Sequence, residues 1–310
     1  MRPQQYKKIT VDGIRGLILA ALDTGSNAWV GDIAMKMTSD QENETYAWLG
    51  NVPGMREFIG GRTPKEISEN SFTISNKDYE TTLAFRNKDV RHDKLGMIKI
   101  RIGQLVERAL DHPAKLLTSL LLAGASALCY DGQYFFDTDH SEGSSGTQSN
   151  SITSAAVSTT VPTVDEMAKA IMAALQAVIG FKDDQGEPMN QSATAFQVQV
   201  PVTFMATALE AVTALLGTGG KSNTLPALKG KFTVDVVVNP RLTWTTKIAV
   251  LRTDSAAKPF ILQEEMPADA DGFGETSEYA KEHGKQLYWV DWSGNVGYAY
   301  WQHACLVTFV

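Results

Sequence analysis

The sequence predicts an α+β protein, because helical and strand patterns of hydrophobic residues both occur in its 310 residues. An amphipathic helical pattern covers residues 98–123, and apolar and polar residues alternate through residues 72–85. Short apolar segments typical of strands recur between residues 197 and 310, and two further helical patterns accompany them at 163–180 and 204–216.

The composition allows a buried core and excludes several classes of protein. Hydrophobic residues make up 43% of the chain and charged residues 20%, and no apolar run approaches the roughly 20 residues of a membrane span. The first residues carry no apolar signal segment, so we expect no secretion. The net charge of −7 argues against a dedicated nucleic-acid grip. Cys129 and Cys305 are expected to be buried free thiols.

The first 50 residues are expected to form an arm. A short helix capped by Thr10 carries an apolar face and ends at Asp23-Thr24-Gly25; its apolar residues are Ile14, Leu17, Ile18, Ala21 and Leu22. The polar segment that follows has too few apolar residues to fold alone, so the arm must lie on another part of the structure.

Residues 72–85 have the pattern of a β-hairpin with one apolar face. Phe72 and Ile74 alternate with polar residues, Asn76-Lys77-Asp78 supplies a turn, and a second alternation continues to Phe85. An isolated two-stranded hairpin is marginally stable in water. We therefore expect the hairpin to project and to pack on another subunit; packing on its own domain is the alternative.

The helical pattern after Gly96 is the longest in the chain. Its apolar residues recur every three or four positions and lie on one face: Ile98, Ile102, Leu105, Val106, Ala109 and Leu110. Pro113 lacks an N–H group, so it should kink the helix or restart it at His112. The apolar stripe then continues to Leu121, and Gly124 is expected to end the helix. Such an element spans roughly 40 Å, at about 1.5 Å per residue.

An aromatic turn, Cys129 to His140, follows the long helix, and the Ser- and Gly-rich segment 141–160 is expected to be a mobile loop or connector. Thr163 and Glu166 form a capping box for the next helix, which ends at Gly180. Its buried face is predicted to contain Met167, Ala170, Ile171, Ala174, Leu175 and Val178.

Strands are predicted beyond this helix, and they place a compact domain over residues 163–283. The predicted strands are 197–200, 232–238, 247–251 and 260–263, and a helix at 204–216 ends in the turn Gly217–Gly220. Two aromatic-rich strands, 286–292 and 296–310, are predicted to flank a turn at Ser293-Gly294-Asn295. Because loose termini rarely end in apolar residues, the last strand is expected to join a sheet.

The segment Asp137-Thr138-Asp139-His140 is the best candidate for an active site. Two carboxylates and an imidazole can ligate a metal or perform acid–base chemistry. Asp and Thr after a strand are also ordinary turn formers. The sequence contains neither His-Glu-x-x-His nor Gly-x-Ser-x-Gly. We therefore predict no catalytic, cofactor-binding or metal residues, and keep a metal-dependent hydrolase using Asp137, Asp139 and His140 as an alternative.

Several segments of the chain are distinctive and occur in a fixed order. The most specific is Cys129-Tyr130-Asp131-Gly132-Gln133-Tyr134-Phe135-Phe136-Asp137, followed by Asp139-His140. The others are Thr45-Tyr46-Ala47-Trp48-Leu49-Gly50, Met55-Arg56-Glu57-Phe58-Ile59-Gly60-Gly61-Arg62, Tyr79-Glu80-Thr81-Thr82-Leu83 and Lys258-Pro259-Phe260-Ile261-Leu262-Gln263-Glu264. In this order the segments resemble the major head subunit of Mu-like phages, and the order of elements resembles the Hong Kong 97-type phage capsid fold.

The resemblance implies a Hong Kong 97-type division of the chain. The expected parts are an N-terminal arm (1–45), an extended β-hairpin loop (46–95), a peripheral domain with a spine helix and connector (96–162), an axial domain (163–283) and strands that return to the peripheral domain (284–310).

The implied function is structural: a major capsid protein that self-assembles into an icosahedral head around double-stranded DNA. Implied partners are further copies in hexamers and pentamers, a separate scaffold and protease, a portal and decoration proteins, with no membrane and no sequence-specific DNA binding. The expected location is the virion, and the host cytoplasm before assembly. The alternative within the same fold is the shell of an encapsulin-like protein compartment.

Overall fold

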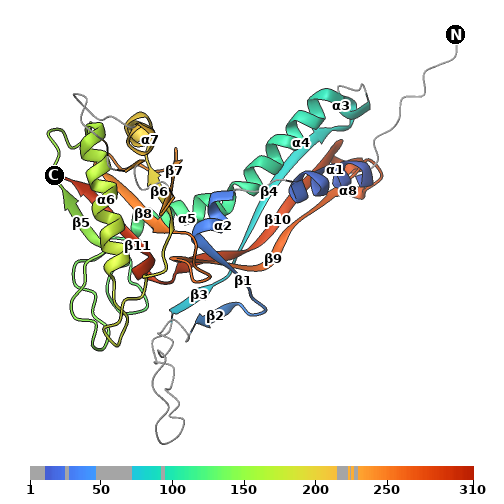
Figure 1. The fold of residues 1–310 in the computed structure, drawn as a ribbon. Coiled ribbons are helices and arrows are strands. Elements are labelled where there is room, and N and C mark those ends of the chain that lie inside the picture. The colour runs from blue at the N-terminus through green and yellow to red at the C-terminus, as the bar shows by residue number, and fades with distance from the viewer. Residues whose placement is uncertain are drawn as a thin grey trace, which may run out of the picture.

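The computed structural model describes residues 11–24, 28–46, 72–91, 95–214, 223, 225–226 and 230–310. In these residues the strands form a four-stranded sheet in the order β1-β9-β10-β4, a five-stranded sheet in the order β5-β11-β8-β6-β7, and a two-stranded ribbon of β2 and β3. The molecule is elongated (Figure 1). A lobe built on the five-stranded sheet lies at one end, and the four-stranded sheet extends away from it.

The four-stranded sheet is built on two long strands, β9 (Phe260–Phe273) and β10 (Lys285–Tyr298), which pair antiparallel. The short strand β1 (Ala34–Thr38) pairs parallel with β9, and β4 (Lys77–Arg86) pairs antiparallel with β10. Helix α8 (Glu278–His283) lies between β9 and β10 in the sequence, and it ends at Gly284 in the left-handed conformation.

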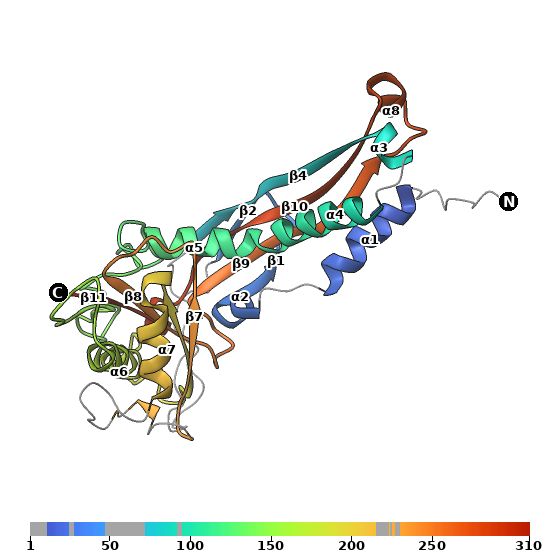
Figure 2. The ribbon, with the colours of Figure 1, turned by 90° about the horizontal axis from the view of Figure 1, so that it is seen from above.

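The predicted long helix is confirmed as two helices placed end to end along this sheet (Figure 2). Helix α4 covers Leu95–Leu110 and α5 covers His112–Ala123. The break falls at Asp111, with Pro113 in the first turn of α5, where its missing N–H costs no hydrogen bond. Gly124 ends α5 as predicted, and a Cβ atom at this position would overlap the ring of Phe136.

The N-terminal helix α1 (Val11–Thr24) is confirmed, and it lies on its own chain. Ile14 and Ile18 are fully buried in a cluster with Ile102 and Leu105 of α4 and with Tyr288 of β10. The predicted cap Thr10 and the end at Gly25 lie outside the described residues. Helices α2 (Ala28–Ile33) and α3 (Asn87–Arg91) are short. Helix α1 is therefore held by contacts within the subunit.

The lobe contains the five-stranded sheet and the two predicted helices. Its strands are β5 (Ser151–Ser154), β6 (Ala195–Val200), β7 (Thr233–Val238), β8 (Lys247–Arg252) and β11 (Ala304–Phe309). Helix α6 (Val164–Gly180) carries the predicted Thr163–Glu166 capping box and buries all six predicted apolar residues. Helix α7 (Met205–Thr213) follows the 3₁₀ turn η1 (Val202–Phe204) and is shorter than predicted. The predicted Gly217–Gly220 turn lies outside the described residues.

The predicted hairpin within residues 72–85 is wrong. Strand β3 (Phe72–Ser75) pairs with β2 (Asn43–Tyr46), whereas β4 pairs with β10. Only Asn76 separates β3 from β4, so the chain continues forward and changes its partner instead of reversing. Alternation correctly gives the buried face, on which Ile74 is buried, but it carries no information about the neighbouring strand. Residues 47–71, which join β2 to β3, lie outside the described residues.

The predicted turn at Ser293-Gly294-Asn295 is also wrong, because β10 runs through it as one strand. The pairing with β9 shifts register between Asp291 and Gly294, which marks an irregularity of the β-bulge kind. A Cβ atom on Gly294 would overlap the Gln263 carbonyl oxygen and the Trp292 ring. Glycine at this position allows the two strands to approach closely. In the sequence, such a glycine looks the same as a glycine that marks a turn.

Three segments pair differently from the expectation. The expected connector 141–160 contains β5, which joins the five-stranded sheet beside β11. Strand β11 also pairs with β8, so the last strand of the chain does not return to the sheet that carries α4 and α5. Strand β9 does belong to that sheet, although residues 260–263 were expected in the lobe. The prediction that the last strand is tied into a sheet is confirmed.

Both cysteines are buried free thiols, as predicted. Burial raises the pKa of Cys305 to about 12 and the pKa of Cys129 well above its usual value. Since the thiolate is the reactive form, neither cysteine should react with a disulfide reagent at about pH 8 while the protein is folded. Both should react in denaturant. Rapid modification of one thiol in the folded subunit, followed by absorbance, would contradict this placement.

Within the described residues, no helix combines the length and the apolar character needed to cross a bilayer.

Candidate functional site

The structure separates the three residues of the candidate active site. The Asp137 carboxylate accepts hydrogen bonds from the backbone N–H groups of Tyr134 and Thr138, at 3.2 and 2.7 Å, and so closes a turn. Asp139 is exposed. His140 is fully buried, with its Nδ1 atom 2.6 Å from Oδ2 of Asp131. Among the described residues, no three His, Cys, Asp or Glu side chains are grouped so that they can hold a metal ion.

A buried polar cluster lies behind the aromatic turn and centres on Glu142. One carboxylate oxygen, Oε1, accepts hydrogen bonds from Tyr130 Oη at 2.6 Å, Trp301 Nε1 at 3.1 Å and Gln302 Nε2 at 3.2 Å. Burial raises the pKa of Glu142, while these hydrogen bonds act in the opposite direction. Burial and the neighbouring Glu142 charge raise the pKa of Tyr130 well above its usual value. One oxygen of the Glu142 carboxylate is thus held by three donors inside the fold.

Trp301 joins this cluster to the crossover between the two sheets. It begins the 3₁₀ turn η4 (Trp301–His303), which lies between β10 of the four-stranded sheet and β11 of the five-stranded sheet. Its ring stacks on His140, with centroids 4.0 Å apart and planes 8° apart, and meets Phe181 edge-on at 5.3 Å. Trp301 is fully buried. The aromatic turn therefore fixes the chain at the point where it passes between the sheets.

Buried amides extend the same network into the lobe. The Asn190 side chain donates to the carbonyl oxygens of Val178 and Gln302, both at 2.7 Å, and accepts from Arg252 Nη1 at 2.9 Å. Asn150 donates to the Phe135 carbonyl oxygen at 2.7 Å. Because a buried amide without partners is costly, these bonds hold one arrangement of helix α6, the aromatic turn and η4.

An ion pair closes this network at the end of β8. Arg252 Nε lies 2.6 Å from Asp254 Oδ1, and the arginine side chain is 7% exposed. The other carboxylate oxygen of Asp254 accepts from the N–H and hydroxyl of Thr194. Burial alone would raise the pKa of Asp254, but the hydrogen bonds from Arg252 and Thr194 lower it to about 2. His303 lies near this pair, and burial with the Arg252 charge lowers its pKa to about 4.

An aromatic group occupies the break between α4 and α5. The His112 ring lies 4.2 Å from Tyr79 of β4 and 5.6 Å from Trp292 of β10. Burial lowers the pKa of His112, and the charges of Lys115 and Arg241 act in the same direction. A neutral imidazole packed on two rings ties the start of α5 to two strands of the long sheet, so the break has a defined position.

The root of the ribbon is fixed by Gln263, a fully buried residue of β9. Its amide oxygen accepts from Tyr46 Oη at 2.8 Å, and its amide nitrogen donates to Asn76 Oδ1 at 2.6 Å. Burial, with the nearby Glu44 charge, raises the pKa of Tyr46 to about 12. The last residue of β2 and the residue that follows β3 are therefore both tied to one buried side chain of β9.

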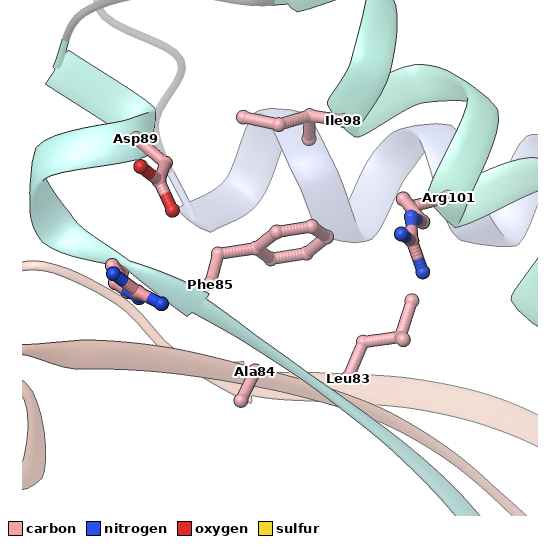
Figure 3. A pocket seen from close by; sticks show the side chains of 7 residues that line it. Leu83, Ala84, Phe85, Asp89, Ile98 and Arg101 are labelled. Atoms are coloured by element: carbon pink, nitrogen blue, oxygen red, sulfur yellow. The ribbon is translucent and has the colours of Figure 1, made fainter.

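A pocket of about 420 Å³ opens between β4 and α4 (Figure 3). The Phe85 side chain lies between Leu83 and Ile98, and the polar groups of Asp89 and Arg101 stand on either side of it. The pocket has an apolar floor with charged residues at its margin. Among the described residues that line it, no two polar groups are in hydrogen-bond contact, so they form no acid–base or nucleophilic site.

Sequence reasoning found Asp137 and His140 but missed the residues that complete the network. Asp131 lies in the specific aromatic segment, and its position nine residues before His140 gives no sign of their contact. Glu142 is an isolated acid in a Ser- and Gly-rich segment, and Gln302 lies far away in the sequence. No signal in the sequence indicates that Glu142 and Gln302 meet, because their contact depends on how η4 crosses between the sheets.

The family model and the similar proteins found by comparison are all phage or prophage head subunits. Residues 13–165 match the model of the family of the Mu-like prophage major head subunit gpT. The major head subunit of the Mu-like prophage FluMu of Haemophilus influenzae is 37% identical over 123 residues, which is 39% of this chain and 40% of that protein. The major capsid protein of Escherichia phage Mu is 35% identical over 108 residues, 35% of each chain. The matches thus span less than half the length of these relatives.

Solved structures extend the likeness of the fold to nearly the whole chain. A chain of the bacteriophage JBD30 procapsid superposes with a TM-score of 0.56 at 24% identity, covering 95% of this chain and 72% of that one. A chain of the mature capsid of bacteriophage PhiM1 gives 0.54 at 11% identity, covering 92% and 87%. The predicted Hong Kong 97-type capsid fold and the predicted resemblance to Mu-like head subunits are confirmed by these matches.

Proposed function

We propose that this protein, which has a phage capsid fold and resembles Mu-like major head subunits through its first half, is a major capsid protein that self-assembles into an icosahedral head shell around double-stranded DNA. The observation that carries the proposal is the agreement of two independent likenesses. The family match covers residues 13–165, and the fold match covers 95% of the chain.

The division of the chain that we propose follows the sheets. Residues 1–45 form the arm and 46–95 the extended loop, whose root is the β2–β3 ribbon. The peripheral domain contains the segment 96–162 except β5, with the spine helices α4 and α5, and the long strands β9 and β10 with helix α8 between them. The axial domain is the lobe of residues 163–283 without β9 and α8, completed by β5 and β11.

The role is structural in this proposal, without catalysis. Support comes from the candidate active site, where the Asp137 carboxylate accepts hydrogen bonds from backbone N–H groups and the His140 ring contacts Asp131. Both side chains stabilise the aromatic turn through these contacts. A metal-dependent hydrolase would need Asp137, Asp139 and His140 to converge, and the structure turns them in different directions relative to the surface, with Asp139 exposed and His140 buried.

The proposed partners are copies of the same chain in hexamers and pentamers, a separate scaffold and protease, a portal and decoration proteins. The net charge of −7 suits a container whose wall does not hold DNA tightly. The proposed location is the virion, and the host cytoplasm before assembly. Many modest contacts, each repeated by symmetry, can sum to a stable closed shell.

Electron microscopy of the purified full chain tests the proposal. We expect closed icosahedral shells of uniform diameter, with nuclease-protected double-stranded DNA and head proteins in particles from producing cells. A chain that stays monomeric at high concentration, with and without a co-expressed scaffold, would contradict it. Shells loaded with an enzyme instead of DNA would favour the protein compartment. A bound metal ion that the Asp139→Ala variant loses while it still assembles would favour the hydrolase.

A further inference from the structure

Strand β4 forms an open edge of the long sheet. It is ten residues long, and in the described part of the chain it pairs with β10 alone. Figure 2 shows β4 along one margin of the sheet, with α1 beside β9 on the other side. Among the described residues, no group outside β10 is hydrogen-bonded to the backbone of residues 78–86. Since alternate residues of an edge strand turn their N–H and C=O groups outward, this margin presents a row of unused donors and acceptors.

The edge lacks the features that commonly block the addition of a further strand. Residues 77–86 contain neither proline nor glycine, and their register with β10 runs through ten pairs without a bulge. The side chains alternate regularly, because Leu83 and Phe85 pack in the cluster beneath α4, whereas Thr82 and Ala84 are exposed. A long, regular edge strand of this kind pairs readily with a strand of another chain.

The charges on the exposed face of β4 are placed unfavourably within one subunit. Arg86 lies directly opposite Lys285 of β10, and Glu80 lies directly opposite Asp291. Like charges in directly opposite positions destabilise a sheet. Among the described residues, none of these four side chains forms an ion pair with an opposite charge. With Asp78 included, the face is acidic at one end of β4 and basic at the other, and neither end is neutralised.

We propose that the occupant of this edge is β4 of a second copy of the chain, paired antiparallel about a two-fold axis at Thr82. In this register Asp78 lies opposite Arg86 of the second copy, and Tyr79 lies opposite Phe85 of the second copy. The two Thr82 residues lie opposite each other. Opposite charges, aromatic pairs and threonine pairs are favourable cross-strand neighbours, and both members of each pair lie on one face of the combined sheet. The two four-stranded sheets then form one sheet across the axis.

The arrangement of charge selects this occupant and this direction. An antiparallel second copy brings the basic end of one strand beside the acidic end of the other, whereas a parallel copy in register would place Arg86 beside Arg86. A shift by one residue would set the half-buried apolar face of one strand against the exposed charged face of the other. The contact is isologous, and an icosahedral shell contains two-fold axes, so the inference rests on the proposed shell function and assigns a contact within it.

Cysteine substitutions on β4 test the pairing and its register in the assembled full chain, whose two native thiols are buried. The Thr82→Cys thiols would face each other across the axis, so mild oxidation should give disulfide-linked dimers on a non-reducing gel. In the proposed register Ala84 lies opposite Glu80 of the second copy. The two Ala84→Cys thiols are then about 14 Å apart along the strand and should not link. Thr233→Cys, exposed on the edge strand β7, is the control for random oxidation. Thr82→Cys shells without linked dimers, or equal linkage of Ala84→Cys, would overturn the proposal.

Reversing the charge at one end of β4 separates association from folding. Arg86→Glu places a carboxylate opposite Lys285 within the subunit, so the unfolding temperature of the unassembled subunit should not fall. The same change sets two like charges opposite each other at both ends of the contact, so the assembled fraction measured by sedimentation should fall about tenfold. Adding Asp78→Arg to this variant restores the opposite charges and should restore assembly. Lys115→Glu, an exposed charge reversal on α5, is the matched control and should assemble normally.

The outcomes distinguish the contact from the function. Normal assembly of Arg86→Glu would overturn the contact and leave the shell function intact, and so would a double variant that assembles no better than Arg86→Glu alone. A wild type that forms no shells, while Thr82→Cys still links into dimers, would reject the proposed function and keep the strand pairing.

Discussion

Replacement of Trp301 by alanine is expected to lower the free energy of unfolding by about 3–5 kcal/mol, the range for truncation of a large buried aromatic residue. The ring is fully buried between His140 and Phe181, and its N–H donates to Glu142 at 3.1 Å. The variant would leave a cavity and would remove one donor from a buried carboxylate. Chemical denaturation of the unassembled subunit, followed by far-ultraviolet circular dichroism, measures the change.

Two further substitutions separate packing from hydrogen bonding at this position. Trp301→Phe keeps most of the ring but removes the N–H group, so it should cost about 1–3 kcal/mol, the penalty for an unsatisfied buried polar group. Trp244→Ala removes a half-buried tryptophan of the same lobe and should cost less than Trp301→Ala. If Trp301→Ala stays within about 1 kcal/mol of the wild type, the crossover does not depend on this residue.

Arg252→Leu should destabilise the subunit by about 1–3 kcal/mol, because it leaves the fully buried amide oxygen of Asn190 without its donor. The guanidinium group contacts Asp254, Asn190 and Ser192 at 2.6, 2.9 and 3.0 Å. Arg241→Leu is the matched control. Arg241 is about half exposed and lies 3.9 Å from an equally exposed Asp111, so its loss should cost at most about 1 kcal/mol. Equal effects of the two variants on the denaturation midpoint would contradict the assignment.

The same ion pair predicts that the stability of the fold depends on pH in the acidic range. The pKa of Asp254 falls from 3.8 to about 2 in the folded protein, so its stabilising contribution is present above pH 3.8 and is lost as the pH falls through about 2. The Asp254→Asn variant should be less stable than the wild type near neutral pH, and the difference should shrink towards pH 2. A difference that stays constant over this range would show that ionisation of Asp254 does not stabilise the fold.

The sequence predicts elements better than it predicts their partners. The capping box at Thr163 and Glu166, the buried face of α6 and the break at Pro113 depend on residues within one or two helical turns, and all three were predicted correctly. The strands around Ile74 and Leu83 were found, but their assignment to one hairpin was wrong. Strand pairing depends on residues more than 200 positions away, such as Tyr288 beside Leu83.

The candidate site shows the same limit. Asp137 and His140 stand out because carboxylates and an imidazole lie close together in the sequence, yet the chemistry of the site depends on Asp131, Glu142 and Trp301. The stacking of His140 on Trp301 joins two residues that are 161 positions apart in the sequence. Local spacing cannot encode such a contact, because it exists only after the chain has crossed between the two sheets.

By itself, the sequence determined the α+β class, the helices with their caps and breaks, the burial of both thiols and the likeness to capsid subunits. The class, the helices and the burial follow from local periodicity, capping chemistry and side-chain hydrophobicity, whereas the likeness follows from matching segments such as Cys129 to Asp137. Only the tertiary structure decided that β3 pairs with β2, that β10 passes straight through its glycine, and that β11 completes the lobe. The physical reason is that an edge strand offers the same backbone donors and acceptors to every possible neighbour, so side-chain packing across distant segments selects its partner.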